Sequence, residues 1–533
     1  MTYQGVSALV RIGRGGLMTD LNDSDIPDTH LVIAKNVEMK NGLTQKEPGS
    51  RRWNGSVLSS GVKALIDWFP AEAVQRFYAV TSDGKVWKLP DPSTQTEITA
   101  SGSAPTTLTT SEHTAISFVA GGEESPGNSR KLFIFSKTNQ IQVIAADAIV
   151  RTNISEPTVD WTGGTFPRGG SVHRNRLWAF MGHRIWASSA TDQEKFITGA
   201  IQFAIYPGEG EEIVASYVYR KRLFLFKRPK GVYMLIDDDT NTANWYFTKV
   251  SDEFGAAGPE AIATVKDDML VANAYGSVTS ARAVEQAAGD INSGDIFGLL
   301  KVSNYFKDSM NLENLDLRKM IYYPDRQVCY MAYQASSGYR NDRLLKIDMA
   351  MQRPELTVVE KDQVECFALR QHVNGRKVPY YGSQDGYIYE MDRADRDVAN
   401  SAYTMQFRTA NMDFSWMDPS FGALNKNFDA IQFKVIPTGR WDVTLRYYID
   451  GIFIESKTFQ PTKGAVLGDF VLAQDRLGSP SSAIITKKLN GRGRTIAIEL
   501  ELGGVRQNMK MLEMRVLFRP SNIDDKETDA GRS

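Results

Sequence analysis

The chain contains the stretch Ser82-Asp83-Gly84-Lys85-Val86-Trp87-Lys88-Leu89, in which an Asp-Gly pair precedes alternating apolar and polar residues. A second stretch, Ser383-Gln384-Asp385-Gly386-Tyr387-Ile388-Tyr389-Glu390-Met391, repeats the pattern far downstream. Asp-Gly between alternating runs is the strongest short-range signal for a β-hairpin, and it favours a type I′ turn with positive φ at both central residues. Both stretches therefore predict a tight hairpin.

Variants of this hairpin recur about every 45 residues, a spacing typical of propeller blades. A strand precedes each hairpin, and it begins with a basic residue followed by aromatic and aliphatic residues, as in Arg76–Val80 and Arg222–Phe226. This pattern suits an inner blade strand packed on both faces. About seven such units lie between Lys63 and Asp392, so we expect a β-propeller. The blade number and the mode of closure stay open.

The flanking regions differ from this repeat, and the fold class that we expect is therefore all-β with three parts. These are an irregular N-terminal arm, a β-propeller and a C-terminal antiparallel β-sandwich, whose short strands alternate like half-buried ones. The predicted ranges are 1–60 for the arm, 61–395 for the propeller with a partly helical insertion near 281–319, 396–520 for the sandwich and 521–533 for a disordered tail.

The bulk composition excludes several classes of protein. Lys and Arg number 62 against 63 for Asp and Glu, which argues against a dedicated nucleic-acid binder. The first residues show no basic and apolar secretory pattern, and no apolar run is long enough to span a bilayer. We therefore expect synthesis in a reducing cytoplasm. Cys329 and Cys366 are expected to be reduced core thiols, with a disulfide between them as the less favoured alternative.

The five histidines do not have the spacing of a zinc site. They are His30, His113, His173, His183 and His372. His173 and His183 flank one predicted strand, across which they could meet. Histidines isolated in blades are more often hydrogen-bonded structural residues, and that interpretation is favoured here.

Two acidic segments are candidate cation sites. Asp20, Asn22, Ser24 and Asp25 resemble a calcium loop, but the glycine expected at the sixth position is Asp25 and the acid expected at the twelfth is Leu31. We expect a solvated loop there. The run 237–239 of three aspartates is expected to be a loop tip that closes a hairpin.

No catalytic motif stands out in the chain. No Gly-x-Ser-x-Gly elbow occurs, and the Gly-rich segments lack the Gly-Lys-Ser/Thr ending of a phosphate loop. Paired carboxylates for glycoside hydrolysis stay possible, because a propeller offers many acids on its central face. The prediction is that the protein is not an enzyme and has no catalytic, cofactor or metal site.

The N-terminal segment resembles the opening of tailed-phage β-propeller structural proteins. The likeness lies in a Gly-Gly-Leu start, an Asn-Val strand and a Gly-Leu…Pro-Gly hairpin that enters the propeller. These correspond to Gly15-Gly16-Leu17, Asn36-Val37 and Gly42-Leu43-Thr44-Gln45-Lys46-Glu47-Pro48-Gly49. The blade segment 184–196 and the following Pro207–Ile213 continue the likeness, which covers roughly residues 10 to 250. Within that group, the chain is most similar to the tail nozzles (tail hub or stabilisation proteins) of short-tailed phages.

The resemblance implies a virion protein of the tail, assembled in the host cytoplasm. It implies a homo-oligomeric ring, typically a hexamer, that extends the portal–adaptor channel, carries fibres or spikes, retains DNA and passes it on ejection. Near-neutral net charge suits a lumen that must not grip DNA. The alternative is a receptor- or glycan-binding tail component, in which Trp416, Trp441 and Tyr447 would stack on sugar. A propeller hydrolase is the third reading.

Overall fold

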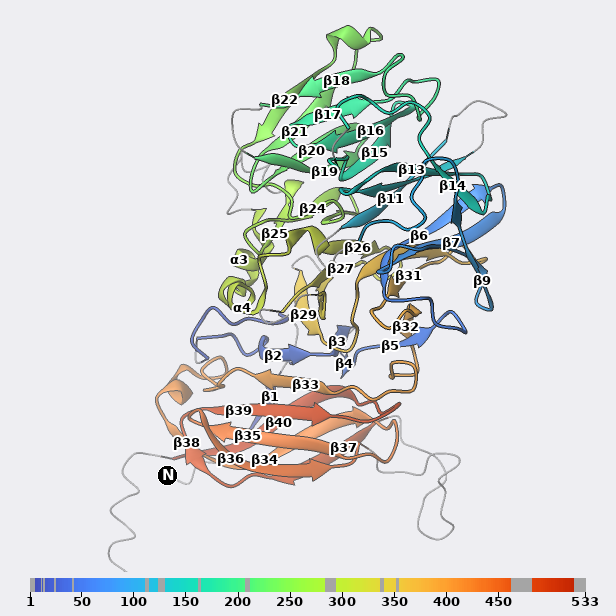
Figure 1. The fold of residues 1–533 in the computed structure, drawn as a ribbon. Coiled ribbons are helices and arrows are strands. Elements are labelled where there is room, and N and C mark those ends of the chain that lie inside the picture. The colour runs from blue at the N-terminus through green and yellow to red at the C-terminus, as the bar shows by residue number, and fades with distance from the viewer. Residues whose placement is uncertain are drawn as a thin grey trace, which may run out of the picture.

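The computed structural model describes most of the chain. The described residues are 5–10, 12, 15–23, 25–40, 43–110, 115–122, 130–161, 164–206, 211–282, 294–335, 340–350, 354–461 and 482–521. They form a β-propeller packed on a β-sandwich, and they are mostly strand (Figure 1). The predicted all-β propeller fold is thus confirmed. The predicted tail lies, apart from Ser521, outside the described residues.

The propeller consists, in the described part of the chain, of seven sheets of three or four main strands. The first strand of each sheet lines one central cavity. These first strands are β6 (Val62–Ala71), β11 (Ile116–Gly121), β15 (Gly169–His173), β19 (Glu212–Tyr219), β23 (Ile262–Val265), β26 (Lys319–Tyr323) and β30 (Cys366–Gln371).

The second strand of each sheet is largely buried. These strands are β7 (Val74–Thr81), β12 (Lys131–Ser136), β16 (Arg176–Met181), β20 (Arg222–Arg228), β24 (Asp268–Ala272), β27 (Val328–Tyr333) and β31 (Lys377–Gly382). The strands that we expected to be inner ones because of their basic first residue, such as Arg76–Val80 and Arg222–Phe226, lie in these second strands. The correction has a physical reason: the second strand has a neighbouring strand on both edges, whereas the first strand faces the cavity.

Third and outer strands complete the sheets. The third strands are β8 (Val86–Asp91), β13 (Asn139–Ala145), β17 (Arg184–Ala187), β21 (Val232–Ile236), β25 (Val278–Ser280), β28 (Arg343–Asp348) and β32 (Ile388–Arg393). The outer strands are β9 (Thr94–Glu97), β14 (Val150–Asn153), β18 (Ile201–Ala204), β22 (Tyr246–Ser251), β29 (Glu355–Val359) and β5 (Gly49–Arg52), and β10 (Thr99–Ala100) adds to β14.

The Asp-Gly hairpins have a different turn from the one expected. At the first hairpin only Gly84 has a positive φ, of 81°. Its N–H bonds to the Thr81 carbonyl at 2.9 Å, and the Thr81 N–H bonds to the Lys85 carbonyl at 3.0 Å. This is a three-residue loop, a type I turn followed by a glycine bulge, and not a type I′ turn. The type I′ geometry occurs instead at Asp450 and Gly451, whose φ values are 49° and 79°.

The N-terminal arm is part of both larger units. Strand β5 pairs with β32 and so completes the last blade, which moves the start of the propeller from the predicted residue 61 back to Gly49. Strand β1 (Val6–Val10) and the hairpin β3 (Val37–Lys40)–β4 (Leu43–Lys46) pair with β40 (Lys510–Ser521) of the sandwich. Strand β2 (Leu31–Lys35) lies between β29 and β33 (Met405–Thr409) and joins propeller and sandwich in one sheet.

The sandwich has two sheets that face each other. One, called the outer sheet here, has the order β3-β4-β40-β34-β37, with β34 at Asn425–Ile436 and β37 at Ala483–Lys488, and β1 pairs with β40 on the same edge as β4. The other continues from β33 through β39 (Ile496–Leu502) and β35 (Val443–Ile449) to β36 (Ile452–Phe459). Strand β38 (Arg492–Gly493) extends β34. Phe433 stacks on Phe459 across the interior at 4.7 Å between ring centroids.

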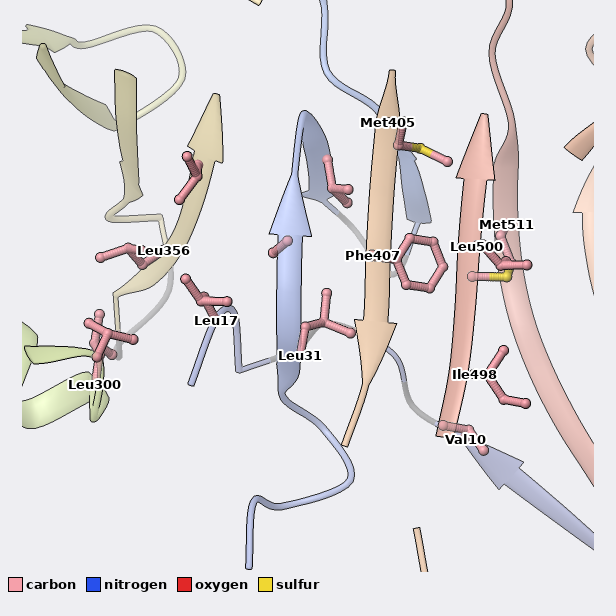
Figure 2. Packing of buried hydrophobic residues seen from close by; sticks show 14 of the residues in the cluster. Val10, Leu17, Leu31, Leu300, Leu356, Met405, Phe407, Ile498, Leu500 and Met511 are labelled. Atoms are coloured by element: carbon pink, nitrogen blue, oxygen red, sulfur yellow. The ribbon is translucent and has the colours of Figure 1, made fainter. Parts of the chain in front are cut away.

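One hydrophobic core runs from the propeller through the arm into the sandwich. Figure 2 shows Leu356 on the propeller side, Leu17 and Leu31 of the arm, and Phe407 and Leu500 of the sandwich along one line of strands. All five side chains are buried in a single cluster. The arm is therefore held by apolar packing on both of its sides.

The insertion near 281–319 contains short helices. They are α3 (Ile296–Leu300), α4 (Ser303–Ser309) and the 3-10 turn η2 (Leu315–Leu317); further 3-10 turns are η1 (Thr242–Asn244) and η3 (Pro419–Gly422). Lys319, which we counted as the end of the insertion, is the first residue of β26. Among the described residues, no helix is long and apolar enough to span a membrane.

Candidate functional site

The central cavity of the propeller is the first candidate site. It has a volume of about 570 Å³, and strands from all seven sheets line it. Its polar side chains come from different blades: Asp67, Ser117, Ser171, Ser216, Glu260 and Lys319. The remaining lining is aliphatic and aromatic, so the cavity is a mixed polar and apolar space.

Lys319 closes one end of the cavity. Its Nζ lies 2.5 Å from Glu260 Oε2 in the neighbouring blade and 3.5 Å from the Ile116 carbonyl oxygen of β11. Strands β26 and β11 belong to blades that are not neighbours, so this one side chain reaches across the axis. Its exposed fraction is only 3%. A space that one lysine side chain can bridge is too narrow for a DNA duplex.

Asp67 lies further along the same cavity. Burial raises the pKa of the Asp67 carboxyl to about 6, although a hydrogen bond from Gln75 acts in the opposite direction. Gln75 Nε2 donates that bond to Oδ2 at 2.5 Å, while Asp67 Oδ1 is buried without a protein partner. The hydroxyls of Ser117, Ser171 and Ser216 are also buried without a protein partner. Ordered water would satisfy all four groups.

The second candidate is a buried charge network where arm, propeller and sandwich meet, which we call the arm junction. Lys346 of β28 donates to both carboxylate oxygens of Glu47 at 3.0 and 2.8 Å. Arg326 lies 2.5 Å from Glu38 Oε1 and 2.6 Å from Asp392 Oδ1. The side chains of Lys346 and Glu47 are each only 5% exposed. Long-range ion pairs thus fix the arm hairpin to two blades.

Electrostatics at the arm junction favours the charged states of Lys346 and Glu38, whereas burial raises the pKa of the Glu47 carboxyl. Burial alone would lower the pKa of Lys346, but the facing carboxylates of Glu47 and Glu38 raise it. For Glu38, burial acts to raise the pKa, and the positive charges of Lys346 and Arg326 hold it below its usual value. On the sandwich side, Lys46 Nζ lies 4.0 Å from the ring centroid of Tyr403. Glu38, Glu47, Arg326, Lys346 and Asp392 each have an ion-pair partner, as buried charges require.

His173 and His372 have structural hydrogen-bond partners. His173 Nε2 lies 2.7 Å from Asp237 Oδ2, and His372 Nε2 lies 3.3 Å from the Tyr380 hydroxyl. His173 and His183 do not meet, because His173 ends β15 beside the start of β16 and His183 lies in the turn after the end of β16. His30 is buried beside Gly15. His113 lies outside the described residues.

Asp237 differs from its expected role as a loop tip. It is 1% exposed, and it accepts hydrogen bonds from His173 and, at 2.9 Å, from Arg174 Nε. Burial acts to raise the pKa of Asp237, yet these bonds hold it below its usual value. The contact joins two neighbouring blades. No sequence signal identified it, because the partners lie about 64 residues apart.

The calcium-like segment has another function in the fold. Asp20 accepts hydrogen bonds from the backbone N–H groups of Ser303 and Asn304, at 2.7 and 3.0 Å, and so satisfies the start of α4. Asn22 donates to Asp25 at 3.3 Å. Ser24 lies outside the described residues. In the described part of the chain, no group of three or more His, Cys, Asp or Glu side chains is placed to hold a metal ion.

The remaining candidates are mostly interior residues. Tyr447 is fully buried, and Trp441 donates its Nε1–H to the Asn508 carbonyl at 2.6 Å while packing against the core. Trp416 is 41% exposed, so it alone of the three proposed sugar-stacking aromatics presents itself on the surface. Cys329 and Cys366 are buried free thiols, and burial raises the pKa of Cys329 to about 12.

Comparison with known proteins adds little. No family model matches the chain, and no curated protein does. Among solved structures, the chain is similar to the computationally designed Ika8 protein, at 9% identity and a TM-score of 0.36, over 64% of this chain and 100% of that one. A likeness at this level carries no argument about function.

Proposed function

We propose that this chain is a structural subunit of a phage tail nozzle, a virion protein that forms a ring, sixfold by analogy, below the portal and its adaptor. The ring would extend the portal–adaptor channel, carry fibres or spikes, retain DNA and pass it on ejection. The proposal begins with the N-terminal resemblance. The residues that carry it, around Gly16, Asn36 and Gly49, belong to the arm that connects propeller and sandwich.

The observation that supports the proposal best is that the arm pairs with both the propeller and the sandwich. Strands of the arm pair with the sandwich at β40, with the propeller at β32 and with both at β2. The buried pair Lys346–Glu47 fixes the same arm by charge. A subunit joined in this way resists separation of its two halves, as a tail component under the pressure of packaged DNA must.

The proposed route of DNA follows from the central cavity. Because Lys319 crosses the propeller axis, DNA would pass through the lumen between copies and not through the propeller of one copy. No described residues form an arrangement that suggests catalysis, and we propose a structural and not an enzymatic role.

The alternative, a receptor- or glycan-binding tail component, keeps one supporting observation. Trp416 is exposed at a loop held by turns in which Asp413 and Asp418 accept backbone hydrogen bonds. A fixed exposed tryptophan can stack on a sugar ring. Trp441 and Tyr447 do not support the alternative, because Tyr447 is buried in the hydrophobic core and Trp441 packs against it.

Cell binding separates the two functions. Under the nozzle proposal, purified protein with Trp416→Ala should bind host cells or polysaccharide no less than the unaltered chain, and neither should bind strongly. Strong binding that Trp416→Ala abolishes would favour the alternative. The position of the protein in tailed particles, by electron microscopy with class averaging, tests the nozzle proposal directly. Particles with the protein confined to peripheral fibres would contradict it.

A further inference from the structure

The outer sheet of the sandwich has two free edges on opposite sides. Along β1 its order is β1-β40-β34-β37, and β4 with β3 lies along the other part of the same edge of β40. Among the described residues no other strand pairs with the outer edge of β37 or with the free edge of β1. A free edge presents unpaired backbone N–H and C=O groups, which are a template for another strand.

Most of the length of the two edge strands lacks the protection that edges usually have. The solvent face of the middle strands carries ion pairs, such as Lys434–Glu513 at 3.1 Å and Arg519–Asp429 at 2.8 Å. Strand β1, by contrast, contains no charged residue, and its Leu9 is 39% exposed. On β37, Ile484 is 52% exposed, and charge occurs only at the end of the strand, at Lys487 and Lys488. Natural sheets protect their edges with charge, proline or bulges, so β1 and the uncharged first four residues of β37 mark a site of strand addition.

The strand directions of the two edges are complementary. Each neighbouring pair in the order β1-β40-β34-β37 is antiparallel, so β1 and β37 run in opposite directions. When β37 of one copy lies beside β1 of a second copy in the same orientation, the new pair is again antiparallel. The alternation then continues from copy to copy.

The side chains also match in one register. If Leu9 lies opposite Ile484, then Ser7 lies opposite Thr486 on the same solvent face, and all four residues are exposed in the single chain. On the other face, Ala8 lies opposite Ile485 and Val10 opposite Ala483, and these four are buried. Four of the five residue pairs thus match in kind, and the fifth places Val6 opposite Lys487. The buried faces of the two strands bring the hydrophobic cores of the two copies together.

We propose that β37 of one copy pairs with β1 of a second copy, and that this contact joins the subunits of the ring. The contact uses two different surfaces of each subunit, as closed rings require. This inference rests on the ring in the proposed function and names its contact surface. The second sheet of the sandwich offers no such contact, since its order ends in β36 on one side and in the cavity strand β26 on the other.

A charge reversal tests the register. In Leu9→Lys combined with Ile484→Lys, two lysines face each other, whereas in Leu9→Glu combined with Ile484→Lys a carboxylate faces a lysine. Both positions are exposed, so both variants should fold, which circular dichroism checks. We expect the full-length double-lysine variant to associate about tenfold more weakly than the unaltered chain, and the Glu/Lys variant to recover association, in sedimentation across concentration.

Cysteine cross-linking tests the same contact by geometry. Directly opposed residues of an antiparallel pair are close enough for a disulfide, and both natural cysteines are buried. Mild oxidation of Leu9→Cys combined with Ile484→Cys should give a ladder of covalent multimers. The matched control, Leu9→Cys combined with Ile452→Cys, places the second thiol on β36, where residue 452 is 68% exposed, and should give none.

The outcomes separate this inference from the proposed function. Three results would overturn the strand pairing. The first is that both charge variants associate as well as the unaltered chain, and the second is that the two cysteine pairs give equal amounts of cross-linked multimers. The third is that the unaltered chain stays monomeric at its highest soluble concentration. A ring seen in tailed particles would survive any of these results. Loss of association in the double-lysine variant, with recovery by Glu/Lys and a specific ladder, is the expected result.

Discussion

Lys346→Met is the change that should weaken the attachment of the arm most. Lys346 is the charge partner of Glu47, with Nζ 2.8 Å from Oε2 and both side chains 5% exposed. Glu38 would keep Arg326 at 2.5 Å, so the substitution leaves one carboxylate, that of Glu47, without a close counter-charge. Breaking a buried pair costs about 3–5 kcal/mol, and the remaining charges place the expected loss near 3 kcal/mol.

The assay is urea unfolding at neutral pH, followed by tryptophan fluorescence, together with limited proteolysis of the arm. The double variant Lys346→Met with Glu47→Gln removes both charges and should recover about half of the loss or more. As a control, Arg519→Met breaks an ion pair whose side chains are 58% and 39% exposed, and it should cost less than about 1 kcal/mol. If Lys346→Met cost no more than Arg519→Met, the arm junction would not hold the arm as described.

Three further predictions concern the propeller. A Cβ at Gly49 would lie 2.2 Å from the Asp397 carbonyl oxygen, so Gly49→Ala should cost about 1–3 kcal/mol and expose the last blade to protease; an unchanged digestion rate would contradict the closure by β5. Burial raises the pKa of Asp67 to about 6. A raised acid pKa stabilises the fold at low pH, so Asp67 should contribute a fall of up to about 2 kcal/mol in the free energy of unfolding, after allowance for solvent screening, as the pH rises from about 4 to 6. Asp67→Asn should remove this contribution, and the same pH dependence in both proteins would refute it. Asp237→Asn should lower stability in thermal unfolding by about 1–3 kcal/mol, and Asp238→Asn, at a side chain 67% exposed, should be nearly neutral; equal effects would contradict the blade contact.

The hairpins and strands of the propeller were predictable because their signals are local. The glycine after Asp83 requires positive φ, and alternating runs such as 86–91 have the period of a strand. Even so, the pattern did not distinguish a type I turn with a bulge from a type I′ turn, because both turns place a glycine with positive φ directly before the second strand of the hairpin. It also did not distinguish first from second strands, since the cavity that separates them is a property of the whole disc.

The closure and the candidate sites were not predictable from local pattern. Strand β5 pairs with β32 more than 300 residues away, and Lys46 contacts Gly504 across 458 residues. Pairings over such distances leave no periodic signal in one sequence. Lys319 was assigned to an insertion, because nothing in its neighbours indicates that its side chain crosses the propeller axis.

The central claim, a ring of this protein in a phage tail, is tested most directly by its symmetry and stoichiometry in tailed particles. Electron-microscopic class averages of particles with a label on this chain would give both. The account predicts a closed sixfold ring below the portal and its adaptor. Single or threefold copies at the tail periphery would contradict it.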